Sequence, residues 1–175
     1  MLSVAPTLNM LSASQIMNTS FEPFHLVNTY GAFGSITRTR YEIVIEGTDD
    51  QEVTSATKWR EYEFKGKPGD PLRRAPQIAP YHLRLDWLMW FEAFSPQPQN
   101  EWFIALLHRL LQGDDATLSL LAANPFPDHP PRFLRARYYR YSFTTADERR
   151  RTGRWWNRQL AGEYVRVITL AAFDR

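Results

Sequence analysis

The sequence contains no cysteine among its 175 residues, and this excludes disulfide bonds, zinc–thiolate sites and thiol redox chemistry within the chain. It also lacks any run of about 18 apolar residues, the length that a membrane-spanning helix requires. Residues 1–17 have no lysine or arginine ahead of their apolar part, and this argues against a secretory signal.

Signatures of catalysis and of metal binding are missing as well. The chain has four histidines, His25, His82, His108 and His129, and no two of them have the i, i+4 spacing of a helical metal site. There is no Gly-x-Ser-x-Gly nucleophile elbow, and no lysine or helix start follows the glycines of residues 31–34 as a phosphate loop requires. The sequence therefore predicts no catalytic residue, no metal and no cofactor.

The overall composition fits one globular domain. Hydrophobic residues make up 43% and charged residues 23%, which are ordinary values, whereas the aromatic content of 14% is high. Tyrosine and tryptophan suit both buried cores and binding surfaces, so the composition favours a binding surface without locating it.

Positive charge is concentrated near the C-terminus. Residues 132–175 hold eleven arginines and four acidic side chains, a formal charge of +7, whereas residues 1–70 carry −3 and residues 71–131 carry −2. Arginine suits an acidic protein partner, a nucleic acid or an anionic lipid. The alternative is a solvated strand face with internal ion pairs. Because the motif of an RNA-recognition sheet is absent, we do not expect nucleic acid as the partner.

The order of patterns predicts an α+β fold. Residues 40–46, 58–64 and 133–143 alternate or are β-branched like strands, and residues 155–170 resemble a terminal hairpin. Between them, residues 86–122 carry helical periodicity. We therefore predict an antiparallel sheet or sandwich of N- and C-terminal strands, with an insert of two to three helices at about residues 86–122. Residues 1–22 are predicted to be an extended arm or linker, and residues 23–175 a single domain.

The helices of the insert have recognisable ends. The first has Trp87, Trp90, Phe91 and Phe94 on one face, with Asp86 as its predicted N-cap. The second runs over residues 101–112 and ends at Gly113, and a third, short helix begins at residue 114 or 115. Two segments, residues 65–80 and 144–153, are predicted to be loops.

Several blocks in a fixed order give the chain a family resemblance over about residues 17–156. They are Asn28-Thr29-Tyr30-Gly31-Ala32-Phe33-Gly34-Ser35, Arg40-Tyr41-Glu42-Ile43-Val44-Ile45-Glu46-Gly47, Trp59-Arg60-Glu61-Tyr62-Glu63-Phe64, Lys67-Pro68-Gly69-Asp70, Arg84-Leu85-Asp86-Trp87, Asn124-Pro125-Phe126-Pro127, Pro130-Pro131, Ala136-Arg137-Tyr138-Tyr139-Arg140-Tyr141 and Trp155-Trp156. In these blocks the chain resembles the C-terminal domain of the lipase maturation factor family.

The resemblance implies a non-catalytic role in protein maturation. Members of that family are membrane proteins, in animals of the endoplasmic reticulum, that homodimeric lipases such as lipoprotein lipase need to reach their active assembled form. The implied partner is therefore a client protein, a lipase or another secreted hydrolase. Membrane association, or a periplasmic location in a bacterium, would depend on a portion that this chain does not contain.

A client surface should combine aromatic and arginine anchors. The candidates are Tyr30, Phe33, Arg38, Arg40, Arg73, Arg74 and Trp87. The alternative for the three aromatic residues is a place in the core.

Two other functions remain open. A glycan-binding module would expose a flat aromatic row, for instance Trp155, Trp156 and Tyr164. An acyl-hydrolysing enzyme would need a polar cleft. Its acid–base candidates would be Glu61 and Glu63, which share a strand face, or Asp86; the structural alternative makes the first two exposed strand acids and Asp86 a helix cap paired to an arginine.

Overall fold

The computed structural model describes residues 2–13, 16, 23–24, 26–27, 39–74, 76–78 and 80–173. The chain forms two compact units, Met1–Arg38 and Thr39–Arg175. No helix in these described ranges has both the length and the apolarity to cross a bilayer.

The first unit contains helix α1 (Val4–Leu11). The Asn9 side chain binds the backbone of Ile16: its amide donates to the Ile16 carbonyl (2.8 Å) and its Oδ1 accepts from the Ile16 N–H (2.9 Å). The segment predicted to be an extended arm thus contains a helix. Pro6 does not break it, since the first turn needs no internal N–H donor.

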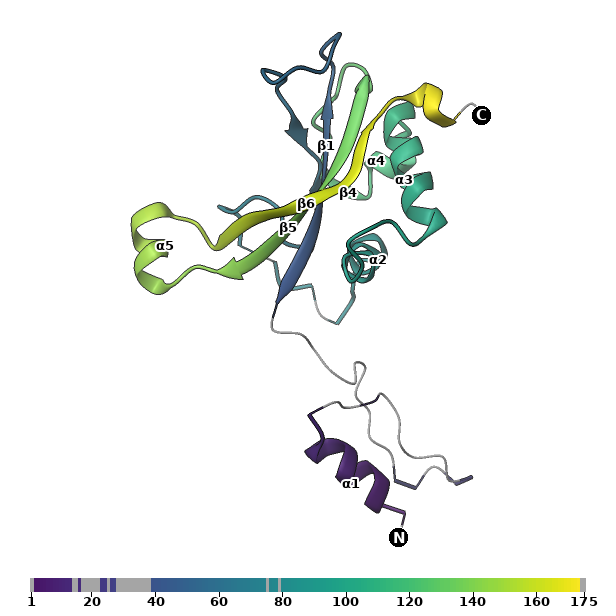
Figure 1. Ribbon diagram of the computed structural model, residues 1–175, viewed down its shortest axis with the longest axis vertical. Coiled ribbons are helices and arrows are strands. Elements are labelled where there is room, and N and C mark those ends of the chain that lie inside the picture. Colours follow the sequence, from purple (N-terminus) through teal and green to yellow (C-terminus); the bar gives the residue numbers. More distant parts are fainter. Residues whose placement is uncertain are drawn as a thin grey trace. The chain divides into compact units, whose positions relative to one another are not determined.

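The second unit is built on a four-stranded antiparallel sheet with the order β2–β1–β5–β6 (Figure 1). Its strands are β1 (Arg40–Thr48), β2 (Arg60–Glu61), β5 (Phe133–Phe143) and β6 (Trp156–Ile168). A smaller sheet pairs β3 (Glu63–Phe64) with β4 (Leu121–Ala123). An early strand pairs with late strands, which confirms the predicted α+β arrangement.

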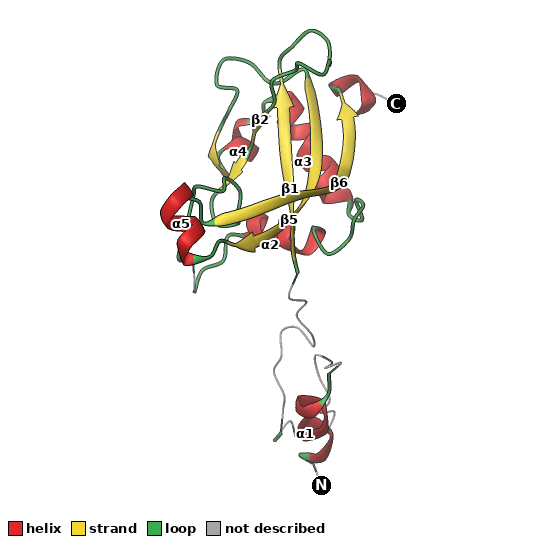
Figure 2. Cartoon of the chain, turned by 60° about the vertical axis from the view of Figure 1, so that its left-hand side comes forward, coloured by secondary structure: helices red, strands yellow, loops and turns green. Residues whose placement is uncertain are grey.

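The predicted helical insert is also confirmed. It consists of α2 (Arg84–Glu92), α3 (Glu101–Gln112) and α4 (Asp115–Leu118). Gly113 takes the left-handed conformation (φ 68°) that ends α3, and Asp114 caps α4 by accepting the Thr117 N–H. Figure 2 shows the helices and strands of this unit coloured by type.

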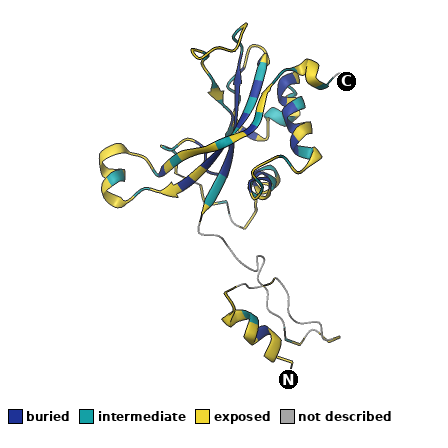
Figure 3. Ribbon diagram, viewed as in Figure 1, coloured by how far each residue is buried: buried dark blue, intermediate teal, exposed yellow. Residues whose placement is uncertain are grey.

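The main core lies between the sheet and α3 (Figure 3). Alternate residues of β1 and β5 point to this side, and the apolar positions of α3 recur with helical period on the facing side. The fully buried members from these elements are Ile43, Ile45, Leu134, Ala136, Phe103, Leu107 and Leu110.

The opposite face of the sheet carries a second, smaller cluster of Val44, Tyr139, Tyr141 and Trp156. The loop of residues 65–74 is held beside it, since the Tyr141 hydroxyl donates to the Gly69 carbonyl (2.7 Å) and the Trp156 indole N–H donates to the Arg73 carbonyl (3.2 Å). Both sheet faces are therefore covered in part, one by helices and the other by this loop.

Two strand predictions were wrong in detail. The predicted strand over residues 58–64 is divided between β2 and β3, which belong to different sheets. The predicted hairpin over residues 155–170 is one continuous strand, β6, because Gly162 pairs with Tyr138 instead of turning the chain. The register shift between Tyr138 and Tyr139 identifies the position as a bulge, which glycine tolerates as readily as a turn.

The loop predicted over residues 144–153 contains helix α5 (Ala146–Thr152), which connects β5 to β6. A capping box starts it, because Thr145 accepts the Glu148 N–H and Glu148 accepts the Thr145 N–H. Gly153, with φ 70°, ends it. A 3-10 turn, η1 (Leu170–Phe173), follows β6.

Three buried tyrosines are expected to make the second unit less stable at alkaline pH. Burial raises the pKa of Tyr62 and Tyr141, and burial together with the hydrogen bond to Glu92 raises the pKa of Tyr164, each above the ordinary value of 10.0. The unfolded chain loses these protons first, so stability is full below pH 10 and falls as the pH rises above it.

We expect ultraviolet difference spectroscopy to show a cooperative late phase in the tyrosine titration, coincident with unfolding followed by circular dichroism. A smooth titration of every tyrosine with no accompanying unfolding would contradict this expectation.

Candidate functional site

Helix α2 departs from the ordinary amphipathic pattern, in which apolar side chains face the core and polar ones face solvent. Its buried residues are Asp86, Met89 and Glu92, two of which are acidic. Trp87 and Phe91, which the sequence pattern places on the apolar face, are 36% and 40% exposed. Buried polar groups and exposed large apolar groups are the informative exceptions to ordinary burial.

The aromatic side chains of α2 form one connected cluster on its outer side, the α2 aromatic surface. Trp87, Trp90, Phe91 and Phe94 contact one another with ring centroids 5.2–5.6 Å apart, mostly edge to face. The geometry is favourable for aromatic pairs and holds the rings in fixed orientations. Phe94 is 59% exposed, so the cluster still presents apolar area to solvent.

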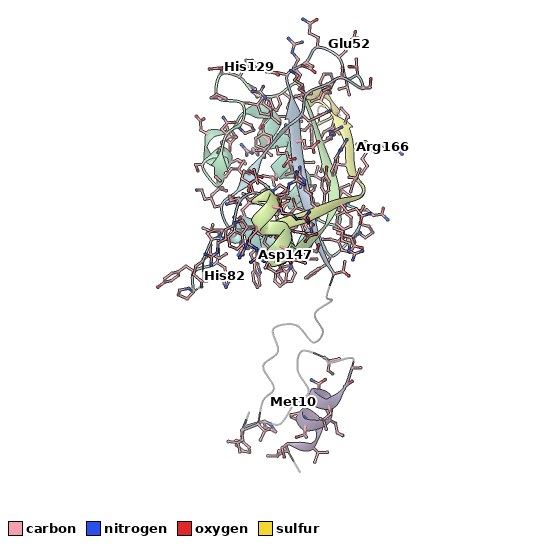
Figure 4. The ribbon with its side chains drawn as sticks, turned by 90° about the vertical axis from the view of Figure 1, so that its left-hand side faces the viewer. Met10, Glu52, His82, His129, Asp147 and Arg166 are labelled. Carbon is pink, nitrogen blue, oxygen red and sulfur yellow. The ribbon has the colours of Figure 1, made fainter. Side chains whose placement is uncertain are left out.

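Two residues before the helix extend this surface. Tyr81 is 86% exposed, and the His82 ring lies 5.3 Å from the Trp87 ring. Figure 4 shows His82 at the edge of the domain. We define the α2 aromatic surface as Tyr81, His82, Trp87, Trp90, Phe91 and Phe94.

Asp86 explains why one side of α2 faces inward. Its Oδ1 accepts the N–H groups of Gly66 (2.6 Å) and Lys67 (2.9 Å), so the carboxylate ties α2 to the 65–74 loop. The prediction that Asp86 caps the helix and pairs with an arginine was wrong, because the helix begins at Arg84 with Leu83 as its N-cap. Asp86 therefore lies inside the first turn of α2, and its carboxylate binds the loop and not the end of the helix.

Glu92 anchors the other end of α2. Its Oε1 accepts from the Tyr164 hydroxyl (2.9 Å) and the Gln99 N–H (3.1 Å), and its Oε2 accepts from the Asn100 side chain (2.5 Å). The buried carboxylate thus joins α2 to β6 and to the start of α3. With Asp86, it fixes which side of α2 faces solvent.

Of the seven predicted surface residues, the structure describes four, and among these it brings only Trp87 into the α2 aromatic surface. Tyr30, Phe33 and Arg38 lie outside the described residues. Trp87 lies in the α2 aromatic surface, and Arg40, whose side chain is 40% exposed, pairs with Glu42 (2.6 Å).

Arg73 and Arg74 have different surroundings from each other and from Trp87. Arg73 donates to the carbonyls of Phe64, Lys65 and Lys67 and pairs with Glu63 (2.6 Å), so it holds the 65–74 loop together. Arg74 is exposed and lies over the Trp155 ring, 5.2 Å from its centroid.

Sequence reasoning missed Tyr81 and Phe94 as surface residues. Phe94 was identified as part of the apolar face of the helix, but that pattern is typical of core-facing side chains. The signal that could have identified the outer face is the spacing of Asp86, Met89 and Glu92, which are three residues apart and share the opposite face.

The other candidate sites have structural explanations. Glu61 makes a two-point ion pair with Arg158 (2.6 and 2.9 Å), and Glu63 pairs with Arg73, so each carboxylate has a cation partner. Trp156 and Tyr164 are 4% and 5% exposed, so the row proposed for a glycan-binding module is not a surface. Within the described ranges, no group of three His, Cys, Asp or Glu side chains could hold a metal.

Comparison with known proteins identifies the group to which this chain is related. The family described as Lipase maturation factor C-terminal domain matches residues 26–166. The chain belongs to the lipase maturation factor family. No solved structure matches it.

The chain is similar to two named members of this family. It is 51% identical to Lipase maturation factor 1 of Mus musculus and 49% identical to that of Homo sapiens, over 97% of the chain in each case. It is 38% identical to Lipase maturation factor 2 of Mus musculus over 86% of the chain. The chain spans 30% of the length of the first two relatives and 21% of the third.

Proposed function

We propose that this domain acts in lipase maturation as a non-catalytic client-binding domain, and that the α2 aromatic surface makes the contact. Family membership supports the maturation role. The observation that carries the site is the inverted helix α2, which buries two carboxylates and exposes Trp87, Phe91 and Phe94.

An incompletely assembled client differs from the finished enzyme by the apolar surface that it still exposes. A receptor for that state needs apolar area of its own, held rigidly so that little side-chain entropy is lost on binding. The ring contacts of Trp87, Trp90 and Phe94 and the anchors at Asp86 and Glu92 supply this rigidity. Aromatic residues are also the commonest hot spots of protein interfaces.

The client in this proposal is a homodimeric lipase before or during assembly. The location is the endoplasmic reticulum membrane in an animal cell, reached through a portion of the family's longer chains that lies outside this sequence. Arg40 remains a further candidate contact, as do Tyr30, Phe33 and Arg38, which lie outside the described residues.

A paired substitution tests the surface. We expect Tyr81→Ser with Phe94→Ser to weaken binding to an unassembled lipase by about 10-fold or more, because each side chain is an exposed aromatic anchor. Binding would be measured by biolayer interferometry with the full 175-residue chain.

The matched control is Ile104→Ser with Leu120→Ser, which removes two exposed apolar side chains of 40% and 49% exposure elsewhere on the domain. The control should bind like the wild type, and both variants should unfold at the wild-type urea concentration. Equal loss of binding in the two variants would reject the α2 aromatic surface as the client site.

A further inference from the structure

The arginines near the C-terminus differ in their partners. Three of those on β5 and β6 are neutralised within the domain, because Arg135 and Arg137 approach Glu46 (2.6 and 3.7 Å) and Arg158 pairs with Glu61, whereas Arg140 and Arg166 have no carboxylate within 4.0 Å among the described residues. For these three, the prediction of internal ion pairs is confirmed. The arginines around α5 are different.

Residues 146–158 contain five arginines and two acidic side chains. One acid, Asp147, pairs with Arg150, and the other, Glu148, belongs to the capping box of α5. Four arginines in and beside α5, namely Arg74, Arg149, Arg151 and Arg154, have no carboxylate within 4.0 Å among the described residues. All four are exposed.

Trp155 organises two of these arginines. The guanidinium carbons of Arg149 and Arg74 lie 4.3 and 5.2 Å from the centroid of its ring. Stacking on an aromatic ring uses the flat face of a guanidinium and leaves its N–H groups directed sideways, available for the oxygens of an anion. Two donors are therefore partly ordered before any ligand binds.

Apolar side chains lie beside this charge. Phe143 is 74% exposed and stacks on Trp156 with ring centroids 4.3 Å apart. Leu72 is 58% exposed and lies close to Gly153, which ends α5. Figure 1 shows α5 at the end of the β5–β6 hairpin, on the other side of the sheet from α3.

We propose that this hairpin end, composed of Leu72, Arg74, Phe143, Arg149, Arg151, Arg154 and Trp155, binds the surface of an anionic phospholipid bilayer. The arginines match lipid phosphates and the negative surface potential, and the two exposed apolar side chains enter the boundary between headgroups and acyl chains. An acidic protein segment would match the charge but gives no role to Phe143 and Leu72. The proposal concerns a different surface from the client site and does not depend on it.

Vesicle co-sedimentation of the 175-residue chain tests the proposal. We expect binding to phosphatidylcholine vesicles that contain about one third phosphatidylserine, and little binding to phosphatidylcholine alone. Replacing Arg149, Arg151 and Arg154 by alanine should lower the partition coefficient on the order of 100-fold, since each basic residue near such a surface contributes about fivefold.

A matched control removes the same charge elsewhere. Arg109→Ala, Arg132→Ala and Arg166→Ala are exposed positions outside the hairpin end, and this variant should keep most of the binding. Phe143→Ser should lower binding by about 10-fold through lost apolar burial. Equal loss in the two arginine variants, no binding to anionic vesicles, or equally tight binding to a soluble polyanion such as duplex DNA would overturn the proposal.

Discussion

Replacing Lys67 by methionine is expected to destabilise the domain by about 3–5 kcal/mol, the cost of removing one partner from a buried ion pair. Lys67 and Glu42 are 4% and 0% exposed, and the Lys67 ammonium lies 3.1 Å from Glu42 Oε2. The ammonium also donates to the carbonyls of Ile43 and Pro68, at 3.1 Å each. The substitution removes the donor to these two carbonyls and the buried cation beside the Glu42 carboxylate.

The double variant Lys67→Met with Glu42→Gln is the control. It removes the uncompensated charge, so we expect it to recover most of the lost stability. Urea unfolding followed by tryptophan fluorescence measures both variants. A single Lys67→Met change that costs less than about 1 kcal/mol would mean that Arg40, which also pairs with Glu42, is enough to neutralise the carboxylate.

The second large effect is expected at Glu92. Glu92→Ala removes the acceptor for Tyr164, Gln99 and Asn100 and leaves a cavity beside α2, so we expect a loss of about 3 kcal/mol or more. Because α2 then loses one of its two anchors, the same change should weaken client binding beyond its effect on stability.

Glu92→Gln separates the hydrogen bonds from the charge. The glutamine oxygen can still accept from Tyr164 and Gln99, and the Asn100 amide can reverse to accept instead of donate. We therefore expect most of the stability to remain. Equal destabilisation by alanine and glutamine, measured by urea unfolding, would show that the charge itself and not the set of acceptors is required.

The sequence was sufficient for elements whose pattern is local. The residues of α3 recur with helical period and end at Gly113, and β5 alternates along its whole length, so both were predicted with the bounds that the structure has. The pairing of early with late strands followed from the order of the elements. These features depend on neighbours in the sequence and on general rules of chain topology.

Features that depend on distant partners were not predictable. Gly162 has the same local signal in a bulge as in a turn, and only its pairing with Tyr138 decides between them. Helix α5 is a different case, because its signals, the capping box of Thr145 and Glu148 and the terminal Gly153, are local; it was predicted as a loop because it has no apolar face. The outward face of α2 results from the contacts of Asp86 with Gly66 and Lys67, which are about twenty positions away.

The arginine-rich end of the chain illustrates the same limit. Composition alone left binding and internal pairing as alternatives for all of these residues. The structure separates them: Arg135 lies opposite Glu46 of the neighbouring strand β1 and Arg158 pairs with Glu61 of β2, whereas Arg149 and Arg154 have no carboxylate within 4.0 Å among the described residues. Which arginines find a partner depends on strand register, and register is not encoded in charge counts.

The measurement that tests the central claim most directly is the affinity of the 175-residue chain for one lipase in two states, unassembled monomers and the finished homodimer. The α2 aromatic surface predicts binding to the monomers that is tighter by about 10-fold or more, with the preference removed by Tyr81→Ser and Phe94→Ser. Equal affinity for the two states, or a preference that survives both substitutions, would contradict the account.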